Sequence, residues 1–72
     1  MNEVKKMRRF IGLTQKEMAA YLGISLQWYW QKENAKTVFK DSEKVLIVEL
    51  FKQDFPGITI EDIFFTQKVS KV

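Results

Sequence analysis

The 72-residue chain contains no cysteine and no histidine. The first absence excludes disulfides and thiolate chemistry, and the two together remove the usual ligands of zinc. Paired carboxylates on a shared face and a glycine-rich phosphate loop are missing too, so we expect neither an enzyme nor a cofactor. A reducing, intracellular setting fits such a composition.

Long apolar runs are missing as well, and no stretch is long enough to span a bilayer. Residues 1–9 are charged rather than apolar, which predicts a cytoplasmic protein without a signal peptide. A chain of this length builds one small domain with a single core. Twelve basic and nine acidic residues give a net charge of +3, which is compatible with a polyanionic partner without requiring one.

Apolar residues recur at helical spacing and predict five short helices with no strand. Thr14 and Glu17 form a capping box, in which the hydroxyl and the carboxylate satisfy free amides at a helix start. Gly12 and Gly23 stand where the first two helices should end. The expected helices span about 3–11, 15–22, 26–33, 42–53 and 60–65, capped by Asn2, Thr14, Ser25, Asp41 or Ser42, and Thr59 with Asp62 in the box position.

The fourth expected helix is apolar nearly all round. One of its sides should pack in the core, and the excess predicts that the other side is partly covered too. Pro56-Gly57 breaks the chain before the last helix. Residues 66–72 show no strong pattern, so we expect the domain to cover residues 1–65 and to be followed by a flexible tail.

Residues 15–34 read as a helix-turn-helix, the two-helix unit that places one helix in the DNA major groove. The features that carry this reading are Gly12-Leu13-Thr14-Gln15, Ala19, Gly23, Ile24, Glu33-Asn34 and a closing helix over 58–64. On these features the chain resembles the lambda-repressor and Cro family over about residues 3–65. The resemblance implies an all-α, compact five-helix DNA-binding domain of the lambda-repressor type.

One implied contact is structural. Arg8 and Glu33 match a pair that in many family members forms a salt bridge between the first helix and the end of the third. A buried pair of this kind is costly to break even when its net stabilisation is small. Two exposed charges are the alternative, and we favour the bridge.

The family's DNA contacts fall on polar residues. Gln15 matches a residue that faces a phosphate at a helix start, and Gln27 and Gln31 occupy base-facing positions from which a glutamine can bond adenine. Lys36 and Lys40 fall in the loop that follows the DNA backbone, although a single lysine is more often solvated. The full set of expected DNA contacts is Gln15, Ser25, Gln27, Gln31, Asn34, Lys36 and Lys40.

The aromatic residues of the third helix favour a protein partner instead. Leu26 and Trp30 lie one turn apart and offer no base-reading pattern. Trp28, Tyr29 and Trp30 together span about 200° of a helix, so at least one indole should be exposed. Exposed apolar residues of this kind are typical of a binding hot spot, for which we expect Leu26, Gln27, Trp28, Trp30 and Gln31.

Three positions depart from the family pattern. Tyr29 and Lys32 stand where apolar residues normally plug the core, so the third helix is expected to be seated differently. Ala35 replaces the usual glycine after Asn34, a change that could move the phosphate-holding loop.

Two functions follow. The chain resembles the small modulator-of-repression proteins of temperate phages of Gram-positive bacteria, which implies an antirepressor that binds the helix-turn-helix domain of a phage repressor in the bacterial cytoplasm. The alternative is a Cro-like repressor that binds operator DNA directly as a homodimer. Phe64, Phe65 and the excess apolar surface of the fourth helix could serve a homodimer or a partner equally well.

Overall fold

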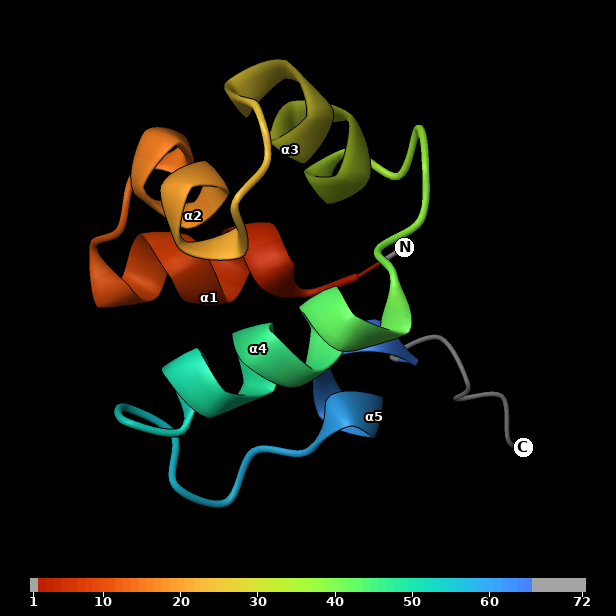
Figure 1. The fold of residues 1–72 in the computed structure, drawn as a ribbon. Coiled ribbons are helices and arrows are strands. Elements are labelled where there is room, and N and C mark those ends of the chain that lie inside the picture. The colour runs from red at the N-terminus through yellow and green to blue at the C-terminus, as the bar shows by residue number, and fades with distance from the viewer. Residues whose placement is uncertain (1, 66–72) are drawn as a thin grey trace.

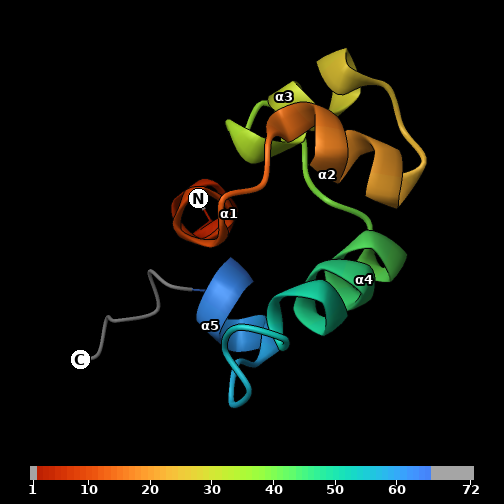
Figure 2. The same ribbon diagram turned by 90° about the vertical axis from the view of Figure 1, so that its left-hand side faces the viewer.

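In the computed structural model, which describes residues 2–65, the chain forms five α-helices and no strand in that range. The elements are α1 (Val4–Ile11), α2 (Gln15–Leu22), α3 (Leu26–Glu33), α4 (Asp41–Phe51) and α5 (Ile60–Phe64). Figure 1 shows α1 across the middle of the molecule, with α2 and α3 on one side of it and α4 and α5 on the other. Seen from the left-hand side, in Figure 2, the same two groups enclose the interior between them.

Three of the helix starts are capped as the sequence predicts. The Thr14 hydroxyl accepts from the amide of Glu17 at 3.0 Å, and the Glu17 carboxylate accepts from the amide of Thr14 at 2.8 Å. Ser25 Oγ accepts an amide hydrogen bond from the first turn of α3 at 3.1 Å. Thr59 and Asp62 repeat the reciprocal box at α5. These contacts fix where α2, α3 and α5 begin.

The start of α1 differs from the expectation. Glu3, not Asn2, is the N-cap residue, and its side chain makes no capping bond. Asn2 acts from one position further out, because its Oδ1 accepts the amide hydrogen of Val4 at 3.0 Å. The end of α1 is as predicted, with Gly12 in the left-handed region at φ 95°.

The limits of α4 also differ. Lys40 is its N-cap residue, so neither Asp41 nor Ser42 caps it, and Asp41 is already helical. The exposed backbone amide of the cap is satisfied from within the helix, since Glu43 Oε1 accepts from the amide of Lys40 at 2.8 Å. The helix ends at Phe51, two residues earlier than expected, and passes into a turn.

The core lies between the two groups of helices. Its largest fully buried side chains include Tyr29, Phe51 and Met18. The loop between α3 and α4 adds Phe39, whose ring lies 6.1 Å from that of Tyr29 and 5.6 Å from that of Phe64. Each fully buried side chain of this size stabilises the fold by roughly 1.5–3 kcal/mol.

The sequence predicts that the outer side of α4 is partly covered, but in the structure this side is exposed. Val45 is 51% exposed and Leu46 37% exposed, so the apolar excess of this helix faces outward. Within the described part of the chain, no helix has the length and apolar character needed to cross a membrane. The expected tail, residues 66–72, lies outside the described residues.

Candidate functional site

The candidate site is built on α2 and α3. A three-residue turn that begins at Gly23, with φ 73°, joins the two helices. The amide of Ile24 donates to the carbonyl oxygen of Ala19 at 3.0 Å, and Ala19 is only 3% exposed. The small side chain allows the turn and α3 to pack closely on α2.

The inner side of α3 is mostly polar. Its buried residues are Tyr29, Lys32 and Glu33, of which only the first belongs to the apolar core. That Tyr29 and Lys32 seat this helix differently from the family stays a prediction, and the structure shows the bonds that both residues make. Ion pairs and hydrogen bonds hold α3 in place together with the buried ring of Tyr29.

Glu33 is the centre of the first bonded group. Arg8 Nε donates to its Oε2 at 2.7 Å and Arg8 Nη2 to its Oε1 at 3.4 Å, so the predicted salt bridge is confirmed. Gln15 Nε2 donates to Oε1 at 2.7 Å, and the Tyr29 hydroxyl donates to Oε2 at 2.8 Å. One carboxylate thereby ties α3 to both α1 and α2.

These contacts shift the pKa values of the group. Burial alone would raise the pKa of Glu33, but hydrogen bonds from Arg8, Gln15 and Tyr29 and the charge of Arg8 lower it below its usual value. Burial, followed by the bond to Glu33 and its negative charge, raises the pKa of Tyr29. Burial opposes the charge of Arg8, yet the bond to Glu33 and its charge raise the Arg8 pKa. The group is thus an ion pair beside a neutral phenol at neutral pH.

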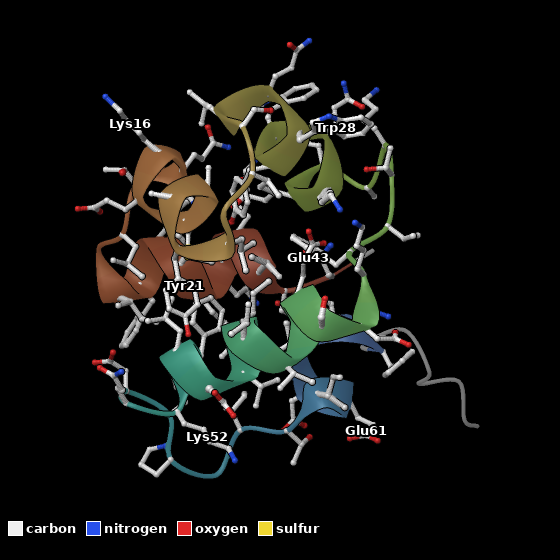
Figure 3. All side chains as sticks on the ribbon, in the orientation of Figure 1. Lys16, Tyr21, Trp28, Glu43, Lys52 and Glu61 are labelled. Carbon is white, nitrogen blue, oxygen red and sulfur yellow. The ribbon has the colours of Figure 1, made fainter. Side chains whose placement is uncertain are left out.

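A second buried ion pair joins α3 to α4. Lys32 Nζ lies 2.7 Å from Glu43 Oε1, with both side chains less than a tenth exposed. Figure 3 shows Glu43 in the space between the two helices. Burial would raise the pKa of Glu43, but the hydrogen bonds from Lys32 and from the Lys40 amide, together with the charges of both lysines, lower it. Lys32 therefore acts as a cross-link between α3 and α4.

The outer side of α3 carries three large exposed side chains. Leu26 is 48% exposed, Trp28 53% and Trp30 44%, so the prediction of at least one exposed indole is confirmed for both. Gln27 is also exposed, and Gln31 is half-buried. The five residues expected at a protein-binding surface are therefore all on the accessible part of this helix.

They do not form a single apolar face. Leu26 and Trp30 share one flank of α3, whereas Trp28 is two positions from each, about 200° around the helix, and lies on the other flank. Gln27 and Gln31 form a polar ridge between the flanks. Trp28 shares a shallow hollow with these glutamines.

A second hollow lies on the other side of Trp28, toward α4. Ile24 and the Lys32–Glu43 pair line it, and Lys40 stands at its edge. Figure 3 places Trp28 on the side of α3 that faces the following loop. The Trp28 indole is therefore bordered by a polar hollow on one side and by a partly charged hollow on the other.

Several of the residues expected to contact DNA already have partners inside the chain. The side chain of Gln15 is engaged by Glu33, Ser25 caps α3, and Asn34 Nδ2 donates to the carbonyl oxygen of Trp30 at 2.9 Å. The two lysines of the expected set differ from these. Lys36 and Lys40 are exposed.

Ala35 has a left-handed backbone conformation. Its φ is +63°, in the left-handed region that alanine rarely enters. The amide of Ala35 donates to Lys32 O at 3.2 Å and the amide of Lys36 to Gln31 O at 2.8 Å, which close the end of α3. The turn therefore follows a left-handed path without a glycine.

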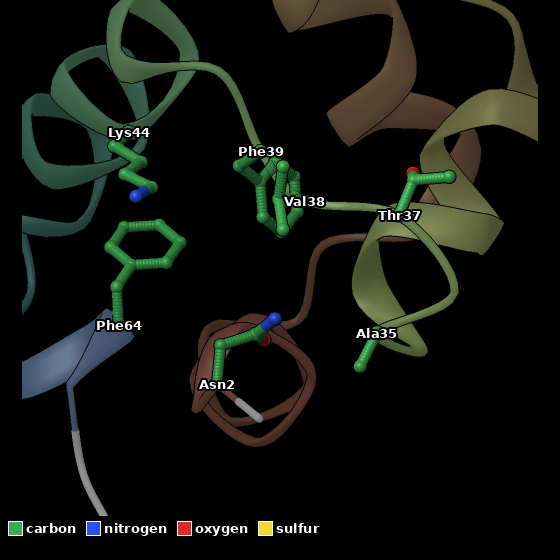
Figure 4. A pocket seen from close by; sticks show the side chains of 7 residues that line it. All are labelled: Asn2, Ala35, Thr37, Val38, Phe39, Lys44 and Phe64. Carbon is green, nitrogen blue, oxygen red and sulfur yellow. The ribbon is translucent and has the colours of Figure 1, made fainter. Parts of the chain in front are cut away.

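Figure 4 shows a further open hollow, which the loop between α3 and α4 lines together with Asn2, Lys44 of α4 and Phe64 of α5. Lys44 lies over the ring of Phe64 there, with Nζ 5.6 Å from the ring centre. The Thr37 hydroxyl oxygen is buried and makes no hydrogen bond within the described residues. Residues 2–65 contain no cluster of acidic side chains that could hold a metal ion.

Charge is unevenly distributed between the two groups of helices. Residues 2–40, which form α1 to α3 and the following loop, carry eight cations and three carboxylates. Residues 41–65 carry two cations and six carboxylates. Within 26–40, Lys32 and Glu33 are buried and paired, so the exposed charges of that segment are the cations Lys36 and Lys40.

Comparisons with known proteins find no match: no protein-family model, no curated protein and no solved structure matches the chain.

Proposed function

We propose that α2, the turn and α3 form a helix-turn-helix unit, and that the chain is an antirepressor. In this function α3 binds the helix-turn-helix domain of a phage repressor and prevents that domain from reaching its operator. The observation that carries the proposal is the exposure of Leu26, Trp28 and Trp30, each about half, on the one helix that this unit would present to a partner.

The energetics favour a protein partner. Tryptophan is among the residues that contribute most to protein interfaces, where its truncation often costs 2 kcal/mol or more. A small protein that leaves two indoles and a leucine about half exposed loses about half of the stabilisation that full burial would give, which is roughly 1.5–3 kcal/mol for each side chain. A partner that covers the two flanks of α3 recovers it.

The same residues fit a base-reading role poorly. Leu26 can touch only a thymine methyl group, and the Trp30 indole has a single donor and no acceptor. Gln27 and Gln31, between the two flanks, can bond peptide groups as well as bases. The ridge of glutamines therefore supplies polar specificity to an otherwise apolar contact.

Titration calorimetry with the purified helix-turn-helix domain of a phage repressor tests the proposal. Trp30→Ala and Leu26→Ala should each weaken binding by about 2 kcal/mol or more, roughly thirtyfold. Val38→Ala is the matched control, because Val38 is 82% exposed but lies in the loop after α3. Binding that is unchanged in both α3 variants, or weakened equally by the control, would overturn the proposal.

A second candidate is direct binding to operator DNA in the manner of Cro. The excess of cations in residues 2–40 favours it, and so does the exposure of Lys36 and Lys40. In that case the chain alone would bind its promoter DNA, with an affinity that falls steeply as salt increases. The antirepressor requires no such binding.

A further inference from the structure

We infer that the hollow between Trp28 and α4 binds a segment of a protein partner that places a carboxylate next to an apolar side chain. We call it the Trp28 hollow, and the residues that line it are Ile24, Trp28, Lys32, Lys40 and Glu43. The inference rests on the proposed function, because the hollow adjoins the outer side of α3, and it specifies the chemistry of the segment that one flank of this helix binds.

The size and the apolar lining of the Trp28 hollow suit one side chain of a partner. Its volume of about 330 Å³ lies at the lower end of the range of ligand sites, about 300–1,000 Å³. Ile24 is half-buried there and Trp28 is 53% exposed. An apolar side chain that enters the hollow removes surface of both residues from water, which favours binding.

A closed ion pair forms the polar part of the lining. Lys32 Nζ lies 2.7 Å from Glu43 Oε1, and both side chains are less than a tenth exposed. Figure 3 shows Glu43 in the space between α3 and α4, with Trp28 above it in this view. The two charges compensate each other, so this pair attracts neither a cation nor an anion strongly.

Lys40 supplies a charge that stays uncompensated. It is exposed, and it forms no ion pair in the part of the chain that the structure describes. The carboxylate next to it in sequence, Asp41, lies 3.9 Å from Lys44 instead. Two lysines and one glutamate line the hollow, which gives it a net charge of +1. A carboxylate of the partner, beside the apolar side chain, complements this charge.

The indole of Trp28 adds a hydrogen-bond donor. Its backbone amide bonds to Ser25, but its indole N–H has no acceptor among the described residues. A carboxylate or a peptide carbonyl group of the partner can accept this bond. An indole thus offers both an apolar surface and one polar contact to the same segment.

A nucleic acid fits the Trp28 hollow less well. A base can stack on an indole, but affinity for a polyanion comes from several cations along its path. Lys40 is the one unpaired cation that lines the hollow, and the carboxylate of Glu43 beside it would repel a phosphate. A single carboxylate attached to an apolar segment requires only the one cation that is present.

NMR of the two ¹⁵N-labelled indole N–H groups tests the inference without a repressor. The probes are the capped dipeptides acetyl-Leu-Glu-amide, acetyl-Leu-Gln-amide and acetyl-Ala-Glu-amide, and Trp30→Phe identifies the signal of Trp28. We expect the first probe to shift this signal with a dissociation constant on the order of millimolar. The second lacks the charge and the third the larger apolar group, so each should bind at least about twofold more weakly.

Lys40→Gln separates the effect of charge from that of shape. In this variant the Leu-Glu and Leu-Gln probes should bind equally well. Lys52→Gln is the matched control, because Lys52 is an exposed lysine at the opposite end of α4, and it should keep the wild-type preference.

Three results would overturn the inference. The first is a Trp28 signal that does not move with acetyl-Leu-Glu-amide at about 20 mM, well above the expected constant. The second is a preference for the charged probe that persists in Lys40→Gln. The third is an eight-nucleotide oligothymidylate that shifts the Trp28 signal at a lower concentration than the peptide, since the hollow would then belong to a nucleic-acid site.

Calorimetry with the purified helix-turn-helix domain of a phage repressor separates this inference from the proposed function. Lys40→Gln should weaken that binding at least about twofold, and Lys52→Gln should not. Binding that is weakened by Trp30→Ala but unchanged in Lys40→Gln would support the proposed function and overturn the inference. A charge-dependent peptide response without any binding of the repressor domain would support the inference and count against the proposed function.

Discussion

Replacement of Glu33 by glutamine tests how α3 is held in place. The substitution keeps the size and shape of the side chain but removes its charge. In the folded chain, Arg8 donates two hydrogen bonds to this carboxylate, and Gln15 and Tyr29 donate one each. A glutamine has one acceptor oxygen instead of two, and its amide group faces donors rather than acceptors.

The expected loss is large relative to the stability of so small a protein. Breaking a buried ion pair by removal of one partner costs about 3–5 kcal/mol, because the other charge stays buried without compensation. At about 0.05–0.15 kcal/mol per residue, the whole chain has a free energy of unfolding of roughly 4–11 kcal/mol. Glu33→Gln should therefore remove between about a quarter and all of it.

Urea unfolding followed by far-ultraviolet circular dichroism measures this change. Glu49→Gln is the control, because Glu49 is an exposed carboxylate of α4 and its substitution should change the free energy of unfolding by less than about 0.5 kcal/mol. A loss below about 1 kcal/mol in Glu33→Gln would refute the reasoning, since the carboxylate would then not anchor α3.

The remaining predictions concern pH, the phenol and the loop. The pKa values of Glu33 and Glu43 are lowered in the folded chain, so the free energy of unfolding should hold its full value above their ordinary pKa of 4.5 and fall as pH decreases through the lowered values. Urea titrations at neutral and acidic pH measure this fall, which should be smaller in Glu33→Gln; an equal fall would contradict the assignment. Tyr29→Phe should cost about 1.5–3 kcal/mol in the same assay, the value of a hydrogen bond to a charged group, and a neutral result would mean that the phenol contributes only packing. Ala35→Gly should raise the free energy of unfolding by about 0.5–1 kcal/mol, because glycine adopts φ +63° without strain; a loss of stability would show that the alanine is not strained.

Features set by neighbouring residues could be predicted from the sequence. The capping box of Thr14 and Glu17, the cap at Ser25 and the left-handed Gly23 depend on residues within one turn, and the structure has all of them. The start of α4 could not be predicted in this way. Its cap residue is Lys40, whose side chain cannot accept a hydrogen bond, and Glu43 satisfies the free amide instead.

In the candidate site, too, some features could be predicted from the sequence and others could not. The exposure of an indole follows from three consecutive aromatic residues, because no helix can turn all three inward. Which of the three aromatic side chains turns inward depends on which side of α3 faces the core. That direction is set by Arg8, which lies 25 residues away from Glu33, and by Glu43, 11 residues from Lys32. Contacts over such separations have no local signature in the sequence, so the bridge between Arg8 and Glu33 could be expected only from the resemblance to a family, and the pair of Lys32 and Glu43 was not expected.

The engagement of Gln15 has the same origin. Its position at a helix start suggested a phosphate contact, but the nearest anion in the folded chain is the carboxylate of Glu33. The amide therefore completes an internal group of hydrogen bonds. The resemblance of Gln15 to a phosphate-contacting position did not predict its hydrogen bond to Glu33.

Fluorescence polarisation of labelled operator DNA tests the central proposal most directly. The chain is titrated first into DNA alone and then into DNA that already carries the repressor, at a low salt concentration of about 50 mM, where any direct binding is strongest. We expect no change with DNA alone and, with the repressor present, a return of the polarisation to that of free DNA. A sequence-dependent rise in polarisation with the chain alone, or a repressor complex that persists at saturating chain, would contradict the antirepressor function.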